Sequence, residues 1–317
     1  MNIVRLITLL LGLIFAGIGS ASDDKSHLPI RFIISDWTSQ IVLSHIAAQI
    51  LQTQGYQTEY VTMTTSEQWG ALQRGLAHIQ MEVWEGTMAD DFTPLVHKGT
   101  ILDAGTYQAK TREDWWYPDY VEKLCPDLPD WQALNRCAYL FRVDDSQEKG
   151  TYFTGPWETK ENLRIKALKM DFVSKQLAHS EDLWKLLDDA IAAQRPIVLF
   201  NWTPNWVEAK YAGKFVEFPT YAHACESLLE WGDNPNLPFD CGNTQSGWLK
   251  KAVWSGLPRT WKCAYQIITN IDFNNSDIAQ LTLQVDRLGH TYDQAASEWL
   301  AANKDQWLAW LPTECKH

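Results

Sequence analysis

The sequence predicts an α/β protein built from two lobes, and three observations support this fold class. Strand-like apolar runs alternate with helical runs in two separate stretches, which is typical of parallel α/β sheets. Two loop-rich regions, beginning near Lys110 and Gly213, follow these stretches. The third observation is a repeated pattern in which an apolar run ends on tryptophan, at Trp37, Trp84 and Trp202.

The first α/β stretch contains three predicted strands and two predicted helices. In its first helix, apolar residues recur at helical spacing from Ile41 to Leu51, and Gly55 suits the left-handed position that closes a helix. Thr64 and Glu67 form a capping-box pattern at the start of the second helix. In order, the elements are strand 30–37, helix 38–54, strand 57–63, helix 64–75 and strand 78–84.

The second α/β stretch begins with residues 165–172, continues through a helix at 181–193 that Ser180 caps, and ends with the strand 196–202. After it the chain becomes loop-rich again, and helices follow from Ser276 onward. We therefore predict that residues 22–110 and 215–317 form lobe I and that residues 111–214 form lobe II.

Residues 1–21 are interpreted as a secretory signal, with Arg5 before an apolar stretch and small residues at the cleavage site. Export and an even number of cysteines, six, predict three disulfides. Six cysteines allow 15 connectivities. Closeness in sequence favours two of the pairs and leaves the third: Cys125–Cys137, Cys225–Cys241 and Cys263–Cys315.

Composition excludes several function classes. A net charge of −12 and a pI near 5.1 argue against a nucleic-acid partner, which would require a basic surface. The chain contains no catalytic, phosphate-binding or zinc-ligand motif, so we predict no enzyme activity, cofactor or metal. Glu82 and Glu85 could be imagined as an acid/base pair, but we interpret them as a solvated face.

The strand-end tryptophans suggest a ligand site. Ligands of open α/β sheets bind beyond the carboxyl ends of the strands, where Trp37, Trp84 and Trp202 are expected. Trp is the best cation–π partner, and a ring of such faces can hold a methylated ammonium group. We interpret most other tryptophans as packing residues, including Trp184 on the 181–193 helix and a terminal helical stripe of Trp299, Trp307 and Trp310.

Two motifs identify a family resemblance over the whole mature chain. The segment Phe200-Asn201-Trp202-Thr203-Pro204-Asn205-Trp206-Val207 is similar to a W-T-P-x-W motif, and residues 68–84 resemble a second wall-bearing segment. Residues 295–300, with Trp310, also fit. The chain resembles the glycine betaine/choline-type substrate-binding proteins of ABC importers. The resemblance implies a type II-like Venus flytrap, in which two lobes close on a ligand in the cleft.

The resemblance also implies the ligand-binding residues. Trp37, Trp84 and Trp202 match positions of the family's aromatic box. Trp116, in a Trp-Trp-Tyr-Pro cluster, and Trp157, before a helix, match segments that supply further walls. For the polar end of the ligand, the 150–157 loop suits a carboxylate, Asp36 suits the hydroxyl of choline, and Glu113 suits trimethylamine N-oxide.

We therefore expect a monomeric periplasmic protein that captures a small methylated ammonium compound of the glycine betaine/choline class and delivers it to an inner-membrane ABC permease. Trimethylamine N-oxide and dimethylsulfoniopropionate are alternative ligands, and a sensor role is an alternative to transport. A different class is a secreted carbohydrate enzyme or sugar-binding module. That class would need two inward carboxylates about 5 to 10 Å apart, or one flat Trp platform in a long groove.

Overall fold

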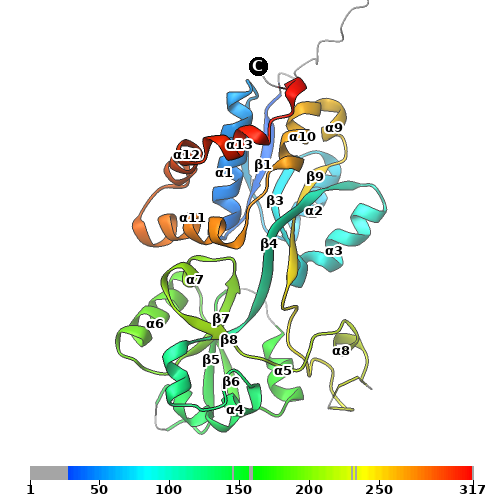
Figure 1. Ribbon diagram of the computed structural model, residues 1–317. Helices are drawn as coiled ribbons and strands as arrows, with labels where there is room; N and C mark the ends of the chain where they lie inside the picture. The colour runs from blue at the N-terminus through cyan, green and yellow to red at the C-terminus, as the bar shows by residue number, and fades with distance from the viewer. Residues whose placement is uncertain (1–27, 145, 157–159, 230, 233, 316–317) are drawn as a thin grey trace, which may run out of the picture.

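The computed structural model describes residues 28–144, 146–156, 160–229, 231–232 and 234–315. Two α/β lobes lie one above the other in Figure 1, joined by long strands. The predicted signal sequence, residues 1–21, lies outside the described residues. The strands that belong to lobe I are β1 (Ile30–Ile34), β2 (Thr58–Thr62), β3 (Ile79–Trp84) and β9 (Gly247–Trp254).

Helices surround the lobe I sheet. They are α1 (Thr38–Thr53), α2 (Glu67–Arg74), α3 (Glu85–His97), α9 (Leu257–Thr260), α10 (Lys262–Asn270), α11 (Asn275–Leu288), α12 (Tyr292–Ala302) and α13 (Lys304–Ala309). The apolar residues of α1, β1 and β3 meet those of α10, α11 and α12 in one core. β3 is buried at every position, as expected for a strand covered on both faces.

Lobe II has a smaller sheet and shorter helices. Its strands are β5 (Gly150–Thr154), β6 (Phe172–Gln176), β7 (Val198–Thr203) and β8 (Gly213–Phe215). Its helices are α4 (Trp131–Arg136), α5 (Glu161–Ala167), α6 (Ser180–Ala192), α7 (Trp206–Lys210) and α8 (Ala224–Ser227). Two apolar clusters fill it, one around Trp115 and one between α6 and β7.

One strand, β4 (Ile101–Pro118), belongs to both lobes. Its first part, to Thr111, pairs with β9, and the next residues, from Arg112 to Trp116, pair with β7. The combined strand order is therefore β2-β1-β3-β9-β4-β7-β5-β6, with β8 on β4. The lobes are held together by continuous backbone as well as by side-chain contacts.

The chain returns to lobe I at Gly247, not at residue 215 as the predicted boundary has it. Val216 and Phe218 are buried in the lobe II core, and the Asn234 side chain donates to the Ala167 carbonyl of α5. The region 216–246 is loop-rich, and its hydropathy pattern therefore does not indicate the lobe to which it belongs. The first crossing, near residue 111, lies beside the predicted division at 110 and 111.

Most predicted elements have counterparts. α1 ends before Gly55, whose φ is +81°, and Thr64 and Glu67 form the reciprocal bonds of a capping box. The 165–172 stretch spans the end of α5 and the start of β6. β4 continues well into the region that was predicted to be loop-rich. At the C-terminal end, the predicted single helix is two helices, α12 and α13.

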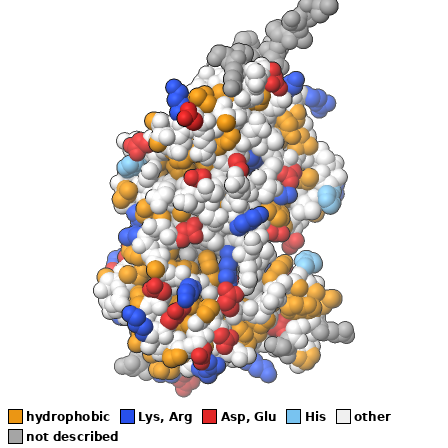
Figure 2. Space-filling model, in the orientation of Figure 1, with side chains coloured by type: hydrophobic (Ala, Val, Ile, Leu, Met, Phe, Trp, Pro, Cys, Tyr) orange, Lys and Arg blue, Asp and Glu red, His pale blue; other side chains and the backbone are white. Residues whose placement is uncertain are grey.

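The structure contains the three predicted disulfides: Cys125–Cys137, Cys225–Cys241 and Cys263–Cys315. On the face drawn in Figure 2, side chains of both charge signs are interspersed with small hydrophobic groups. Of the helices in the described part of the chain, none has the length and apolar character required to cross a bilayer.

The Cys263–Cys315 bridge should contribute more stability than the shorter bridges. Replacing both cysteines with serine should lower the free energy of unfolding by about 2 to 4 kcal/mol, because the open chain gains entropy when unfolded. The matched control is the Cys125/Cys137 double variant, whose bridge spans a sequence separation of 12 instead of 52. It should lose about 1 kcal/mol less on the entropic account. Urea unfolding measures both, and equal losses would contradict this account.

Candidate functional site

Trp37 and Trp84 are held by the same carboxylate. Trp37 follows β1, Trp84 ends β3, and the indole nitrogens donate to one oxygen of Glu82, at 2.6 Å and 3.0 Å respectively. Ser39 donates to the same oxygen at 2.9 Å. Because these three donors share one acceptor atom, the two rings lie together at the carboxyl ends of neighbouring strands. Burial raises the pKa of Glu82 to about 7, against the lowering effect of its hydrogen bonds.

Trp202 and Glu113 stand opposite each other where the lobes join. They are paired residues of β7 and β4, so their side chains project to the same side of the sheet. The Glu113 carboxyl reaches the first turn of α3, where a β-carbon added to Gly86 would lie 2.5 Å from its Oε2. Burial, and then the neighbouring Asp114, raise the pKa of Glu113 to about 8.

A hydrogen-bond network fixes the backbone around Glu113. The Asn243 amide donates to the Glu113 carbonyl at 2.6 Å, and Arg164 of α5 donates to Asp114 at 2.9 Å and to the Asn243 side chain at 2.7 Å. Arg164 and Asp114 are both buried. The strand that leaves lobe I is thus fastened to the segment that returns to it.

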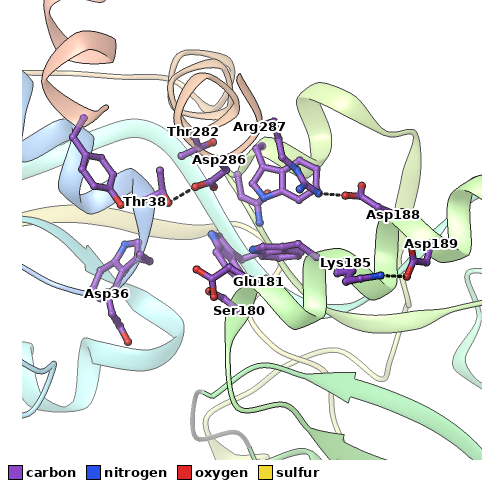
Figure 3. A pocket seen from close by; sticks show the side chains of 16 residues that line it. Asp36, Thr38, Ser180, Glu181, Lys185, Asp188, Asp189, Thr282, Asp286 and Arg287 are labelled. Atoms are coloured by element: carbon purple, nitrogen blue, oxygen red, sulfur yellow. Dashed lines mark hydrogen bonds and ion pairs between the residues drawn. The ribbon is translucent and has the colours of Figure 1, made fainter. Parts of the chain in front are cut away.

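A cavity of about 580 Å³ lies between the lobes. In Figure 3, Asp36 approaches from the lobe I side, and Ser180, Glu181 and Lys185 approach from α6. The aromatic residues that line it are Trp37, Trp184, Trp202, Trp206 and Tyr292. Trp37 from lobe I and Trp202 from lobe II therefore line the same cavity. The ring centroids of Trp184 and Trp202 are 5.4 Å apart.

Helix α11 closes one side of this cavity and contacts both lobes. Asp286 accepts a hydrogen bond from Thr38, the residue after Trp37, at 2.6 Å. The next residue, Arg287, pairs with Asp188 of α6 at 2.7 Å and lies 3.7 Å from the centroid of the Trp206 ring. Burial raises the pKa of Asp286 to about 6. Neighbouring side chains of one helix thus connect the two lobes.

The structure does not bring every predicted site residue to this place. Among the described residues that line the cavity, neither Trp84 nor Glu113 is present. Trp116 is 3% exposed and packs in the lobe II core against Gly213, so the tandem tryptophans of β4 are both core residues. Asp36 lines the cavity and is exposed. Trp157 lies outside the described residues.

Several residues of the site were not predicted from the sequence, among them Trp206, Tyr292 and Asp286 of the cavity lining. Glu82 and Trp184 are the two whose predicted role differs from what the structure shows. Glu82 was interpreted as solvated, yet it is fully buried under two of the box candidates. Trp184 was assigned to helix packing; it packs in the core and also lines the cavity. The signal for Glu82 was available, because a charged residue in the apolar run that precedes Trp84 is unusual for a buried strand. Trp184 lies in the apolar stripe of its helix, and such a stripe does not show which of its residues also line a cavity.

Two α/β lobes joined by crossing strands, with a cavity between them, define a solute-binding protein of the Venus-flytrap type. The chain belongs to the family described as the substrate binding domain of the ABC-type glycine betaine transport system, whose model matches residues 29–302. The resemblance found from the sequence is confirmed at this level, as is the fold class.

Known relatives extend this result. The chain is 36% identical over 303 residues to a trimethylamine N-oxide-binding protein of Pelagibacter ubique (strain HTCC1062), covering 92% of this chain and 93% of the relative. Its fold matches a choline-binding protein in complex with choline, with TM-score 0.64, 16% identity, and coverage of 90% and 93% of the two chains. It also matches lactococcal OpuAC complexed with glycine betaine, with TM-score 0.64, 16% identity, and coverage of 90% and 99%.

The raised pKa of Glu113 predicts that the ligand-free protein loses stability as the pH rises from about 5 to 8. Across that window the folded protein holds a proton that the unfolded chain releases, so deprotonation favours unfolding. Glu113→Gln should reduce the slope of melting temperature against pH, and the exposed control Glu59→Gln should not. Thermal melts at pH 5, 6.5 and 8 measure this, and parallel curves for wild type and Glu113→Gln would refute it.

Proposed function

We propose that this protein captures a small methylated amine outside the cytoplasmic membrane and delivers it to an inner-membrane ABC permease. Binding and release are its whole activity, with no catalytic step, and it acts as a monomer in the periplasm. The proposal extends the family assignment, which establishes a substrate-binding domain of a transport system. The hinge strand β4 allows the lobes to close around the ligand.

The observation that carries the proposal is the meeting of strand-end tryptophans from both lobes. Trp37 and Trp84 share the Glu82 oxygen in lobe I, and Trp202 lines the same cavity as Trp37 from lobe II. A methylated ammonium group has no N–H to donate, so aromatic faces are its natural partners. Three such contacts, each worth about 1 to 2 kcal/mol when desolvated, supply a large part of the roughly 8 kcal/mol that micromolar affinity requires.

Within this ligand class we favour trimethylamine N-oxide. The cavity is lined by five carboxylic residues and two basic residues. Both basic residues already form ion pairs, Lys185 with Asp189 and Arg287 with Asp188. Glycine betaine and trimethylamine N-oxide both have no net charge, but betaine carries a separate carboxylate that would meet this negative excess, whereas the N-oxide holds its negative charge on an oxygen bonded directly to the nitrogen. Glu113, with its pKa raised to about 8, holds a proton at pH 7 and can donate it in a hydrogen bond to the oxide.

Choline, glycine betaine and dimethylsulfoniopropionate are the competing ligands. Choline suits the acidic cavity because it is a cation, and its hydroxyl could donate a hydrogen bond to the Asp36 carboxylate. Calorimetry of the purified protein against these three compounds, carnitine and trimethylamine N-oxide orders them directly. Tighter binding of glycine betaine than of trimethylamine N-oxide would reject our choice of ligand and leave the class standing.

Loss of either box wall should weaken binding without unfolding the protein. Trp84→Ala and Trp202→Ala should each cost about 1 to 3 kcal/mol of binding free energy, roughly five- to 150-fold in Kd, through lost cation–π attraction and water exclusion. Trp299→Ala is the matched control. Its ring is buried in lobe I, stacked on Trp310, and should affect the melting temperature but not Kd. Unchanged calorimetric Kd values in folded Trp84→Ala and Trp202→Ala would exclude the aromatic box.

Replacing Glu113 should change the Kd of each ligand in a way that depends on the ligand's polar group. Glu113→Gln replaces an acid O–H with a weaker amide donor, so trimethylamine N-oxide should bind about ten times more weakly. Glycine betaine should bind equally well or better, because a potential negative charge is removed. Wild-type affinity for the N-oxide should also fall as the pH rises above about 8, where Glu113 loses its proton. Calorimetry from pH 6.5 to 9 tests both effects, and an N-oxide affinity independent of residue 113 would show that the oxide is bound elsewhere.

A further inference from the structure

The carboxylate of Glu82 is buried with only one of its oxygens satisfied. Oε2 accepts three hydrogen bonds, from Trp37, Ser39 and Trp84, whereas Oε1 is buried without a hydrogen-bond partner. The side chain is fully buried in the middle of lobe I. A buried carboxylate oxygen without a partner lowers the stability of the folded protein, because it loses its hydrogen bonds to water and gains no others.

The donors around Glu82 are all uncharged. Within the part of the chain that the structure describes, an indole pair and a hydroxyl bind it, and neither Lys, Arg nor His contributes to the pKa of this group. A buried charge is normally paired, and leaving one without its counter-ion is strongly unfavourable. Trp37, which donates to Glu82, also lines the cavity, so a positively charged ligand held there would lie on the other side of this ring.

The other charged and titratable groups around Glu82 have their own partners or lie on the cavity side. Lys250 of β9 pairs with Asp103 at 2.7 Å, and Lys251 donates to the carbonyls of Thr269 and Ile271. On β4, the Tyr107 hydroxyl donates to the Met81 carbonyl at 2.8 Å. The remaining groups of the surrounding elements include the acidic Asp36, Glu113 and Asp286. They also include two bases, Arg31 of β1 and His45 of α1, which contacts Asp293 at 2.7 Å, and neither base contributes to the pKa of Glu82. No neighbouring base of the described chain is therefore available as a counter-ion for Glu82.

We propose that Glu82 determines specificity in the aromatic box by fixing the Trp37 and Trp84 rings and by supplying the negative charge that a methylated nitrogen neutralises. The inference rests on the proposed function and adds a residue that never touches the ligand. An indole that donates its N–H to a carboxylate carries more electron density on its face, which strengthens cation–π attraction. The box therefore selects a positive nitrogen over a neutral group of the same shape.

This role makes binding depend on pH in a particular direction. Ligand binding requires the ionised carboxylate, so affinity should fall as the pH drops below the Glu82 pKa of about 7. One proton is involved, which limits the change to about tenfold per pH unit. The trend is opposite to that expected from Glu113, whose protonated form assists binding of an N-oxide.

The test uses two ligands and the intact protein. Trimethylamine N-oxide engages both ends of the site, whereas tetramethylammonium has the methylated nitrogen but no polar end for Glu113 to meet. Kd is measured by calorimetry at pH 6, 7 and 8, with tert-butanol as the neutral isostere. Wild type should bind both methylated compounds more weakly at pH 6 than at pH 7, and tert-butanol much more weakly than either at every pH.

Glu82→Gln preserves shape and removes the charge. It should raise Kd for both methylated compounds about tenfold or more at pH 7 and abolish the decline of affinity between pH 7 and pH 6. Glu113→Gln should keep that decline. Glu208→Gln is the matched control, since Glu208 also has its pKa raised by burial but bonds to Thr203, away from Trp37 and Trp84. It should leave Kd and its pH dependence unchanged.

Ser39→Ala gives a second test should Glu82→Gln fail to fold. It keeps the carboxylate and both indoles but removes one donor to the ionised form, so the midpoint of the low-pH decline should move to higher pH. A folded Glu82→Gln protein with wild-type affinity and pH profile, or an unmoved midpoint in Ser39→Ala, overturns the role of Glu82. Failure of wild type to bind any methylated amine would instead overturn the proposed function.

Discussion

The shared acceptor atom of Glu82 sets the geometry of the lobe I half of the site. The rings of Trp37 and Trp84 come from the ends of different strands, and they keep a fixed relative orientation only if the Glu82 side chain that binds both is itself fixed. Glu82 is itself fixed from the core: Gln80 accepts from the Glu82 amide at 3.2 Å and from Gln40 of α1 at 2.7 Å, and it donates to Gln68 of α2 at 2.6 Å. The register of β3 against β9 shifts between Gln80 and Val83. This polar network thus holds an irregular strand in place immediately before Trp84.

The lobe II half depends on a different constraint, the continuity of β4. Because one strand pairs with β9 and then with β7, any rotation of the lobes must be absorbed near Thr111, where the pairing changes. Glu113 lies two residues beyond that point, and Arg164, Asp114 and Asn243 hold its backbone to lobe II. Glu113 and Trp202 therefore move as one unit relative to Trp37 and Trp84. Closing the lobes would change the distance between the two halves without disturbing either.

The strand-end tryptophans could be predicted from the sequence for two reasons that agree. The local pattern places each Trp at the end of an apolar strand, and the carboxyl ends of strands are where an α/β sheet binds its ligand. The spacing of the cysteines favoured the pairs that the structure contains, but it did not select them from the 15 possible connectivities. Trp116 could not be placed, because strand alternation separates neighbouring side chains and both faces of β4 in lobe II are buried. Trp184 belongs to a helical stripe that packs and lines a cavity at once. Glu82 was misread because its partners Trp37 and Ser39 are more than 40 residues away.

The two acidic groups of the site place opposite demands on the protein. Burial disfavours the ionised form of both Glu82 and Glu113, so both oppose folding as the pH rises toward 8. A ligand with a positive nitrogen offsets this cost at Glu82, because it stabilises the charged form, whereas an oxide at Glu113 stabilises the protonated form. A dipolar ligand meets both needs near pH 7, where Glu82 is partly ionised and Glu113 is mostly protonated. A simple cation meets only the first, and a carboxylate-bearing betaine is opposed at the second by any ionisation of Glu113. On the proposed function, the arrangement would distinguish ligands by the order of their charges as well as by their methyl groups.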